Sequence, residues 1–311
     1  MKRSLLCFIF ILSLFLGGCG APAAPIVSTQ PSETAITFTD DLDREVTVDM
    51  PRRVACLIGS FAHTWCLAGG QESLGAAAAD TWTQFDLGLD EDVVNLGAVK
   101  EPNLELLLAA QPDLVIASSN TAAQVELLET FEAMGLNAAY FKVSSFEEYL
   151  EMLEICTRIT GFEENYRHYG TDILAQVDAA REKADGFAPR VLYVRATGSS
   201  FKVKSSRDSV LGEMLNDLGC VNIADGGLLE ELSMEVILQE DPEHIFLVIQ
   251  GSDPTQAEAL LEKTLLSNPA WEMLTAVQEG RLHIMDPALY NLKPNDRWGE
   301  AYEKLADILY P

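Results

Sequence analysis

The strongest constraint on the fold is a series of short apolar runs that alternate with helix-forming segments. The runs Val54–Ile58, Leu114–Ala117 and Ile245–Val248 each have strand length and contain no charged residue. Continuous apolar runs of this length are typical of strands that are buried on both faces. Strands that alternate with helices favour a parallel sheet covered by helices. The sequence therefore predicts an α/β fold.

The alternation stops near residue 146 and resumes near residue 187. Between these points the chain is charged and helix-favouring, and its apolar residues at 162–184 recur at helical spacing. A helix of about 22 residues there would be roughly 33 Å long. We expect two Rossmann-like lobes with central parallel sheets, an N-terminal α/β lobe at 36–145 and a C-terminal one at 187–311. A connecting helical segment at 146–186 would join them.

Several elements can be placed individually. Residues 36–39 and 45–48 flank a run of aspartates and predict a hairpin. Residues 121–134 and 297–309 predict helices, and residues 282–285 predict a strand. Ligands bind open α/β sheets at the carboxyl ends of their strands, so we expect the ligand cleft between the two lobes.

The N-terminal residues follow the pattern of an export signal. Lys2 and Arg3 precede an apolar run that is too short to span a membrane comfortably, and Gly17-Gly18-Cys19 follows it. Residues 1–18 resemble a lipoprotein signal peptide, which implies lipidation of Cys19, and residues 19–35 lack periodicity, as a flexible tether does. We expect an extracytoplasmic protein, lipid-anchored to the cell membrane. The alternative is an ordinary secretory signal in which Cys19 has no role.

Charge and cysteine content exclude some functions. The chain has 48 acidic and 21 basic residues and a formal net charge of -27, which argues against nucleic-acid binding and favours a soluble monomer. Beyond the signal and Cys19, the cysteines are Cys56, Cys66, Cys156 and Cys220. Their spacings match no CxxC metal motif, and whether any of them form disulfides stays open.

The ordered motifs resemble those of one protein family. Four stretches carry the resemblance: Thr39–Val48 followed by Pro51–Val54, Asn103–Glu105 followed by Gln111–Ile116, Leu232–Glu235 followed by Glu240–Ile245, and Asn268–Trp271 followed by Ala276–Arg281. In this order they are similar to the substrate-binding proteins of ABC transporters for siderophores, haem and cobalamin, in which a rigid helix joins two lobes. The resemblance covers nearly all of residues 36–311.

The resemblance implies contacts with membrane permease subunits. Glu105 and Glu235 each precede an apolar run that leads to Pro-Asp or Pro-Glu. In the family, one such glutamate in each lobe meets an arginine of the transporter, so we expect Glu105 and Glu235 to dock on the permease. The alternative is that both carboxylates only stabilise helix starts, where the helix dipole favours negative charge.

Loops after the predicted strands supply the candidate ligand residues. Aromatic rings offer flat contact area, and cationic groups favour an anionic ligand. The candidates are Ser60, Phe61, Trp82, Phe85, Arg195, Lys202, Lys204, Tyr290, Lys293 and Arg297. For Lys202 and Lys204, the alternative is that they only solvate an exposed strand.

These residues suggest an iron chelate, most simply a ferric siderophore, with haem or cobalamin as alternatives of the same class. His63, near the predicted cleft, is a candidate axial haem ligand or a partly buried helix residue. The four histidines have no paired helical spacing, so we predict no metal site and no resident cofactor. The sequence contains no GxSxG, HExxH or P-loop spacing, so we expect no enzyme. The different-class alternative is a lipid-anchored metalloenzyme or chelatase-like protein, since such enzymes share the fold.

Overall fold

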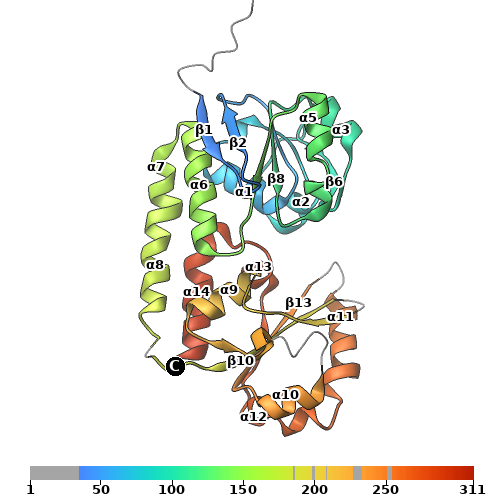
Figure 1. The fold of residues 1–311 in the computed structure, drawn as a ribbon, viewed down its shortest axis with the longest axis vertical. Coiled ribbons are helices and arrows are strands. Elements are labelled where there is room, and N and C mark those ends of the chain that lie inside the picture. Colours follow the sequence, from blue (N-terminus) through green and yellow to red (C-terminus); the bar gives the residue numbers. More distant parts are fainter. Residues whose placement is uncertain (1–34, 185, 198–199, 208, 227–232, 251–253) are drawn as a thin grey trace, which may run out of the picture. The chain divides into compact units, whose positions relative to one another are not determined.

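The computed structural model describes residues 35–184, 186–197, 200–207, 209–226, 233–250 and 254–311. The predicted signal peptide, lipidation site Cys19 and all but the last residue of the tether lie outside the described residues. Within the described part, two five-stranded sheets with helices on their faces form an N-terminal and a C-terminal lobe (Figure 1). The predicted α/β fold is confirmed, whereas the exact lobe bounds stay predictions.

The N-terminal lobe contains the predicted hairpin and a parallel sheet. Its elements are β1 (Ile36–Thr39), β2 (Glu45–Val48), β3 (Val54–Cys56), α1 (Gly59–Leu67), the 3₁₀ helix η1 (Gln71–Ser73), β4 (Leu74–Ala77), α2 (Asp80–Gln84), β5 (Val94–Asn95), β6 (Gly97–Ala98), β7 (Glu101–Pro102), α3 (Leu104–Ala110), β8 (Leu114–Ser118), α4 (Ala122–Val125), α5 (Leu128–Met134) and β9 (Ala138–Phe141). The sheet has the order β5-β4-β3-β8-β9, and all its pairings are parallel. The helix predicted at 121–134 is divided into α4 and α5.

The C-terminal lobe repeats this plan. Its elements are β10 (Arg190–Ala196), β11 (Phe201–Val203), α9 (Val210–Asp217), β12 (Val221–Asn222), η3 (Ile223–Gly226), α10 (Met234–Glu240), β13 (His244–Ile249), α11 (Pro254–Leu261), the π-helical turn η4 (Glu262–Leu266), η5 (Trp271–Met273), α12 (Thr275–Gln278), β14 (Leu282–Met285), α13 (Pro287–Tyr290), η6 (Asn295–Arg297) and α14 (Trp298–Leu309). The main path of the sheet is β11-β10-β13-β14, and β12 pairs with β10. Within this sheet, only β11 among the described strands runs antiparallel to its neighbour.

Two antiparallel helical stretches connect the lobes (Figure 1). The first is α6 (Phe146–Thr160), which begins with a capping box between Ser145 and Glu148 and ends at Gly161 with a φ of 78°. The second consists of α7 (Glu163–Tyr166), a π-helical turn η2 (Arg167–Thr171) and α8 (Asp172–Arg181). The three pieces of this second stretch, residues 163–181, together span about 28 Å at 1.5 Å per residue. The predicted long connecting helix is present, with a π turn that the sequence pattern did not reveal.

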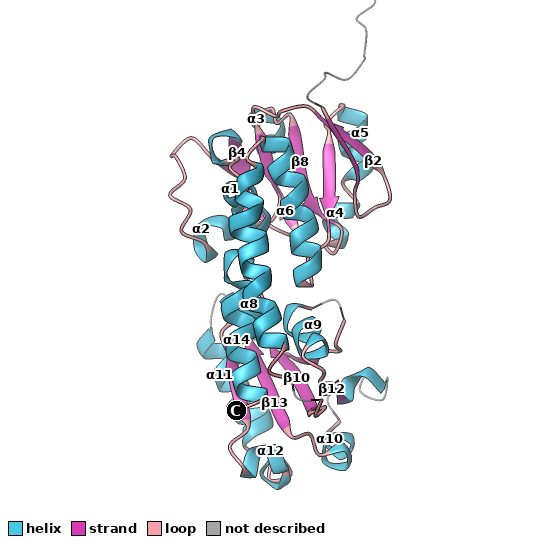
Figure 2. Cartoon of the chain, turned by 90° about the vertical axis from the view of Figure 1, so that its left-hand side faces the viewer, coloured by secondary structure: helices cyan, strands magenta, loops and turns pink. Residues whose placement is uncertain are grey.

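One apolar core continues through both lobes. Alternate residues of each strand point to this core, because successive side chains face opposite sides of a sheet. Cys56 of β3 and Tyr193 of β10 both belong to it. Val177 of α8 and Tyr302 of α14 belong to the same cluster. The two helices lie side by side in Figure 1, and α8 overlies α14 in the turned view of Figure 2. Their burial ties the lobes together along the connecting helices, which favours small movements over a wide rotation.

The two lobes share a local motif at the start of a central strand. In the N-terminal lobe, the Asp113 carboxylate accepts hydrogen bonds from the backbone N–H groups of Arg52 and Arg53. In the C-terminal lobe, the Glu243 carboxylate accepts from the backbone N–H of Arg190. Each acid follows the proline of the repeated motif, which explains why Pro-Asp and Pro-Glu occur at equivalent places.

Candidate functional site

A cavity of about 180 Å³, here called the cleft cavity, lies between the carboxyl ends of the strands of the two lobes. Its N-terminal wall comes from the residues that follow β8 and β9, and its C-terminal wall comes from β10, the start of α9 and the chain after α13. The lining residues are Ser118, Asn120, Thr121, Val143, Ser144, Tyr193, Arg195, Ser209, Val210, Tyr290, Asn291 and Lys293. This is the place that open α/β sheets use for ligands.

Two predicted cations, Arg195 and Lys293, line the cleft cavity. Arg195 lies on β10, on the same face of the strand as Tyr193 because side chains alternate. Burial lowers the pKa of Lys293, while the nearby carboxylates of Asp80 and Glu148 oppose this shift. The cavity therefore presents positive charge in a protein that is otherwise strongly acidic.

A second cavity of about 280 Å³, here called the side cavity, adjoins the first through Lys293. The predicted residues Phe85 and Arg297 line it, together with His63. The Arg297 guanidinium already forms a two-point ion pair with Glu300, at 2.7 and 3.1 Å. Arg297 is therefore less available to a ligand than the sequence suggested.

His63 is held by its surroundings in the side cavity. Its ring centroid lies 5.2 Å from that of Phe85, its Nδ1 lies 3.2 Å from Asn295 Nδ2, and its Nε2 lies 3.8 Å from Asp296 Oδ1. Burial lowers the pKa of His63, and Asp296 opposes the shift. Both ring nitrogens thus face protein groups, as expected for a partly buried helix histidine.

The structure places Ser60 and Phe61, which the sequence suggested for the cleft, in the interior. Phe61 is 1% exposed and packs edge-on against Phe141 with ring centroids 6.5 Å apart. Ser60 is buried as well, and its carbonyl oxygen accepts hydrogen bonds from Thr64 Oγ1 and Asn295 Nδ2. The first turn of α1 faces the C-terminal segment, which covers it, so neither side chain lines a described cavity.

The other predicted ligand residues divide between cavity and surface. Tyr290 lines the cleft cavity, but its hydroxyl donates to Ala301 O at 2.9 Å, and burial raises its pKa. Trp82 is 40% exposed and lines neither cavity. Lys202 is exposed on β11 directly opposite Arg195, whereas Lys204 follows the strand; both lie outside the cavity linings. Their role in ligand binding stays a prediction.

Sequence reasoning missed Tyr193, a principal residue of the cleft cavity. Tyr193 is 1% exposed, lines the cavity, and has no hydrogen bond from its hydroxyl to any described residue. Burial raises its pKa to about 12, and the charge of Arg195 opposes the shift, so the phenol is a hydrogen-bond donor at neutral pH. The spacing of two from Arg195 was the available signal, since residues i and i+2 share one face of a strand.

Asp80 is a second residue that the sequence did not single out. Its carboxylate accepts the backbone N–H of Gly59 at 2.9 and 3.0 Å, at the N-terminus of α1. Burial raises its pKa, and the hydrogen bond and Lys293 oppose the shift. Gly59 is required here because an added Cβ would lie 2.7 Å from the backbone N of Thr81.

The predicted docking residues have the local geometry that was expected. Glu105 and Glu235 are exposed and lie in the first turns of α3 and α10, which have seven residues each. In α3 the Asn103 side chain caps the helix by accepting from the N–H of Leu106. Both carboxylates are accessible, and their contact with a permease stays a prediction.

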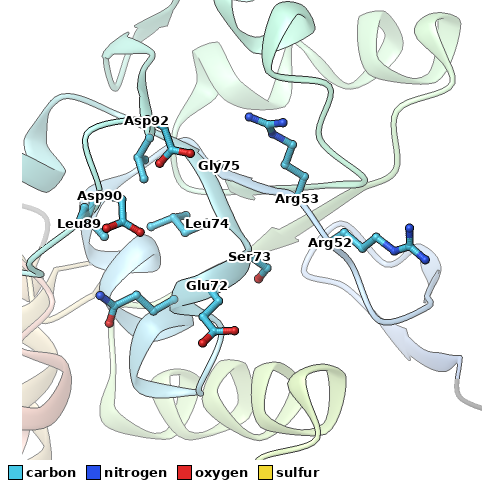
Figure 3. Close-up of a pocket in the computed structure, with 11 residues that line it drawn as sticks. Arg52, Arg53, Glu72, Ser73, Leu74, Gly75, Leu89, Asp90 and Asp92 are labelled. Carbon is cyan, nitrogen blue, oxygen red and sulfur yellow. The ribbon is translucent and has the colours of Figure 1, made fainter.

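Two larger described cavities lie away from the cleft. One, of about 600 Å³, lies at the amino ends of β3 and β4, where Asp90 and Asp92 lie across from Arg52 and Arg53 (Figure 3). The other, of about 650 Å³, lies beside α9 and includes Arg207. Neither joins both lobes at the carboxyl ends of the strands, so neither has the position expected of the ligand site.

The described residues also bear on metals, disulfides and membrane insertion. No group of three or more His, Cys, Asp or Glu among them could hold a metal ion. The described cysteines, Cys56, Cys66, Cys156 and Cys220, are all free. Within the same residues, no helix combines the length and apolar character that a membrane span needs.

Comparison with known proteins identifies a matching family. The model of a family described as periplasmic binding protein matches residues 54–289. A candidate ABC transporter substrate-binding lipoprotein of Bacillus subtilis, YhfQ, is 21% identical, and the alignment covers 94% of this chain and 93% of that protein. The iron-uptake system-binding protein of the same organism is 26% identical, with 92% of both chains covered.

Solved structures show the same fold at low identity. The siderophore-binding protein BauB, solved with ferric iron and two acinetobactin molecules, has a TM-score of 0.70 and 18% identity, covering 89% of this chain and 99% of that one. IsdE of S. aureus, solved with heme, has a TM-score of 0.69 and 15% identity, covering 83% and 99%. These similarities support the two-lobed architecture.

Proposed function

Because the chain belongs to the periplasmic binding protein family, we propose that it is the lipid-anchored solute-binding component of an ABC importer. It captures an anionic iron chelate, a ferric siderophore, and delivers the chelate to the permease. The observation that carries this proposal is the cleft cavity between the lobes, where Tyr193, Arg195 and Lys293 present donors and positive charge. Charge-assisted hydrogen bonds from such groups are well suited to acidic oxygen atoms.

Family membership also confirms the expectation of a binding protein that is not an enzyme. A largely pre-formed cleft gives affinity without a large ordering cost. The continuous core along α8 and α14 is consistent with modest lobe movement on binding. We therefore propose capture and release of an unaltered ligand.

Haem and cobalamin are the alternative ligands of the same class. A haem would need an axial protein ligand, for which histidine, cysteine, methionine and tyrosine are used; of these, the described lining of the cleft cavity contains only the tyrosines Tyr193 and Tyr290. His63 lies in the side cavity with both nitrogens facing Asn295 and Asp296. The siderophore is therefore proposed on the positive charge of Arg195 and Lys293 in the cleft cavity.

The ligand class can be tested by absorbance and intrinsic fluorescence of the purified protein. Ferric siderophores, haemin and cobalamin have distinct visible spectra, so each is added in turn and the unbound ligand is removed. We expect a ferric chelate to remain with the protein and to quench tryptophan fluorescence on titration. Retention of only haemin or only cobalamin would exclude the siderophore.

Permease docking by Glu105 and Glu235 can be tested by charge reversal. Because both side chains are exposed, we expect Glu105→Arg with Glu235→Arg to abolish cellular uptake and to leave ligand affinity unchanged. Glu129 provides a matched control, since it is exposed in the first turn of the seven-residue helix α5. Equal loss of uptake in Glu129→Arg would mean that the glutamates act only at helix starts.

The lipid anchor can be tested separately. We expect Cys19→Ser to release the protein from the membrane fraction into the extracytoplasmic medium, because the thiol that carries the lipid is lost. Cys66→Ser is the control and keeps membrane association. Retention of the Cys19→Ser protein on membranes would remove this part of the proposal.

A further inference from the structure

The cavity of about 600 Å³ at the amino ends of β3 and β4, here called the end cavity, lies away from the ligand cleft. Arg52 and Arg53 precede β3, and Leu74 begins β4. Because the pairings of this sheet are parallel, the carboxyl ends that face the cleft are at its other end. The volume falls within the range of about 300–1,000 Å³ for small organic ligands. A molecule bound in the end cavity would therefore leave the cleft open.

Charged side chains of both signs surround the end cavity. Asp90 and Asp92 lie across from Arg52 and Arg53 (Figure 3), and Glu72 also lines the cavity. All five are exposed. None of these side chains forms a hydrogen bond or ion pair with another residue in the described part of the chain. The acids and the arginines thus face one hollow without direct neutralisation, which suits a ligand that carries both a positive and a negative group.

The arginine side of the end cavity is fixed by contacts that leave the guanidinium groups available. The Asp113 carboxylate accepts from the backbone N–H groups of Arg52 and Arg53, at 2.8 and 3.1 Å. Gly75 makes room for the Arg53 side chain, since an added Cβ would lie 2.7 Å from Arg53 Cγ. Buried Leu74 adds an apolar surface to the lining. The site is therefore preformed, which limits the ordering cost of binding.

The end cavity lies close to the point where the described chain begins. The first residue of β1, Ile36, pairs with the last residue of β2, and Arg52 follows β2 by four residues. Met50 lies in the same short connection and is 63% exposed. Residues 20–35 precede β1, and a flexible chain of these 16 residues spans about 20–24 Å on average. A lipid on Cys19 would therefore keep this end of the lobe near the bilayer.

We propose that the end cavity binds the zwitterionic headgroup of a phospholipid with a primary ammonium group, as in phosphatidylethanolamine. The phosphate contacts Arg52 and Arg53, because planar guanidinium groups match phosphate oxygens bidentately. The ammonium group donates hydrogen bonds to Asp90 and Asp92, and Met50 adds an apolar contact with the bilayer. This inference rests on the lipid anchor of the proposed function and adds a second membrane contact to it.

Charge and hydrogen bonding decide between headgroups. The formal net charge of -27 repels an anionic headgroup such as that of phosphatidylglycerol, over about 8 Å at physiological salt. Phosphatidylcholine is zwitterionic as well, but its trimethylammonium group has no N–H to donate to carboxylates. Tethering by a short flexible linker gives an effective concentration in the millimolar range. A weak contact with the headgroup is therefore sufficient to hold the lobe at the membrane.

Calorimetric titration of the full chain in detergent with soluble headgroups tests the site. The probes are glycerophosphoethanolamine, glycerophosphocholine and glycerophosphoglycerol. Arg52→Gln with Arg53→Gln, the arginine-pair variant, removes the positive side and keeps the backbone hydrogen bonds of this segment. Asp90→Asn with Asp92→Asn, the aspartate-pair variant, removes two of the acids. Arg158→Gln is the matched control, because Arg158 is exposed and lies outside the end cavity.

We expect the wild type and Arg158→Gln to bind glycerophosphoethanolamine about 10-fold more tightly than the other two probes, as for hydrogen bonds between charged groups. The arginine-pair variant should bind it at least about 10-fold more weakly. The aspartate-pair variant should bind glycerophosphoethanolamine and glycerophosphocholine equally. Wild-type affinity in the arginine-pair variant, a preference of the wild type for glycerophosphoglycerol, or no binding of any probe would overturn the assignment.

Vesicle flotation distinguishes the bilayer from a free zwitterion. The Cys19→Ser protein collected from the medium, which lacks the lipid, is mixed with vesicles of phosphatidylcholine alone or with added phosphatidylethanolamine. We expect flotation only with phosphatidylethanolamine, and none after the arginine-pair change. Binding of the soluble headgroup without this flotation would overturn the membrane contact and identify a free zwitterion. Retention of a ferric chelate by the same proteins is measured in parallel, and a wild type that retains none would refute the proposed function alone.

Discussion

Asn295 provides the sharpest test of how the C-terminal segment is joined to the N-terminal lobe. It is 1% exposed in η6, and its Nδ2 donates to Ser60 O at 2.9 Å and lies 3.2 Å from His63 Nδ1. Its φ is 54°, in the left-handed region that asparagine tolerates better than most residues. The contact joins positions 235 residues apart in the sequence. We expect Asn295→Ala to weaken this junction.

The magnitude follows from two contributions. Each lost hydrogen bond has a net effect of about 0.5–1.5 kcal/mol, and alanine in the left-handed region adds about 1 kcal/mol. The Oδ1 atom of Asn295 has no partner among the described residues, so its removal costs nothing further. Asn295→Ala should therefore lower the free energy of unfolding by about 2–4 kcal/mol. Asn295→Gly keeps the backbone conformation without strain and should lose about 1 kcal/mol less.

Urea denaturation followed by tryptophan fluorescence measures both variants against the wild type. The difference between alanine and glycine isolates the backbone contribution from the side-chain hydrogen bonds. A loss below about 0.5 kcal/mol for alanine, or a larger loss for glycine than for alanine, would refute this account of the junction.

Two further predictions concern stability. Gly299→Ala should lower the free energy of unfolding by about 1–3 kcal/mol, although alanine has the better helix propensity. The reason is that the new Cβ would lie 2.7 Å from Gln176 Cβ, between α14 and α8. An unchanged free energy of unfolding in urea would contradict this prediction. Burial and the charges of His283 and Arg281 lower the pKa of His244 to about 4, so the folded state keeps His244 neutral while the unfolded chain becomes protonated below about pH 6.5. Stability should therefore fall as the pH drops from about 6.5 to about 4, by on the order of 3 kcal/mol. Thermal unfolding of His244→Phe should lack this contribution, and parallel pH profiles would argue against it.

The fold was predictable because its signals are local. Uncharged apolar runs at 54–58, 114–117 and 245–248 mark strands buried on both faces, and the structure contains β3, β8 and β13 there. The predicted strand at 282–285 coincides with β14. Breaks inside helical stretches were less visible. In α4 the buried Gln124 side chain accepts a hydrogen bond from Ser118 N and donates to Leu57 O and Val99 O, and distant partners of this kind leave no periodic signal in the sequence.

The candidate site was predictable only in part. Arg195 and Lys293 were predicted because cations stand out in an acidic chain, and both line the cleft cavity, whereas their contact with a ligand stays a prediction. Phe61 lies in the core, which the sequence could not indicate because an aromatic residue after a strand suits a cleft and a core equally well. Its burial against Phe141 is decided by the packing of α1 on β9, which is a contact between segments 80 residues apart.

The sequence alone determined the elements and their α/β class, because strand and helix periodicity and helix caps act within a few residues. It also determined the excess of negative charge against which a few cations become conspicuous. The tertiary structure decided which polar groups satisfy one another. The Asp80 carboxylate accepts the Gly59 N–H at the N-terminus of α1, and the Asn295 amide donates to Ser60 O. The Tyr193 hydroxyl has no hydrogen-bond partner within the described residues. Such pairings depend on groups brought together by folding, since a hydrogen bond requires its atoms to lie within about 3 Å whatever their separation along the chain.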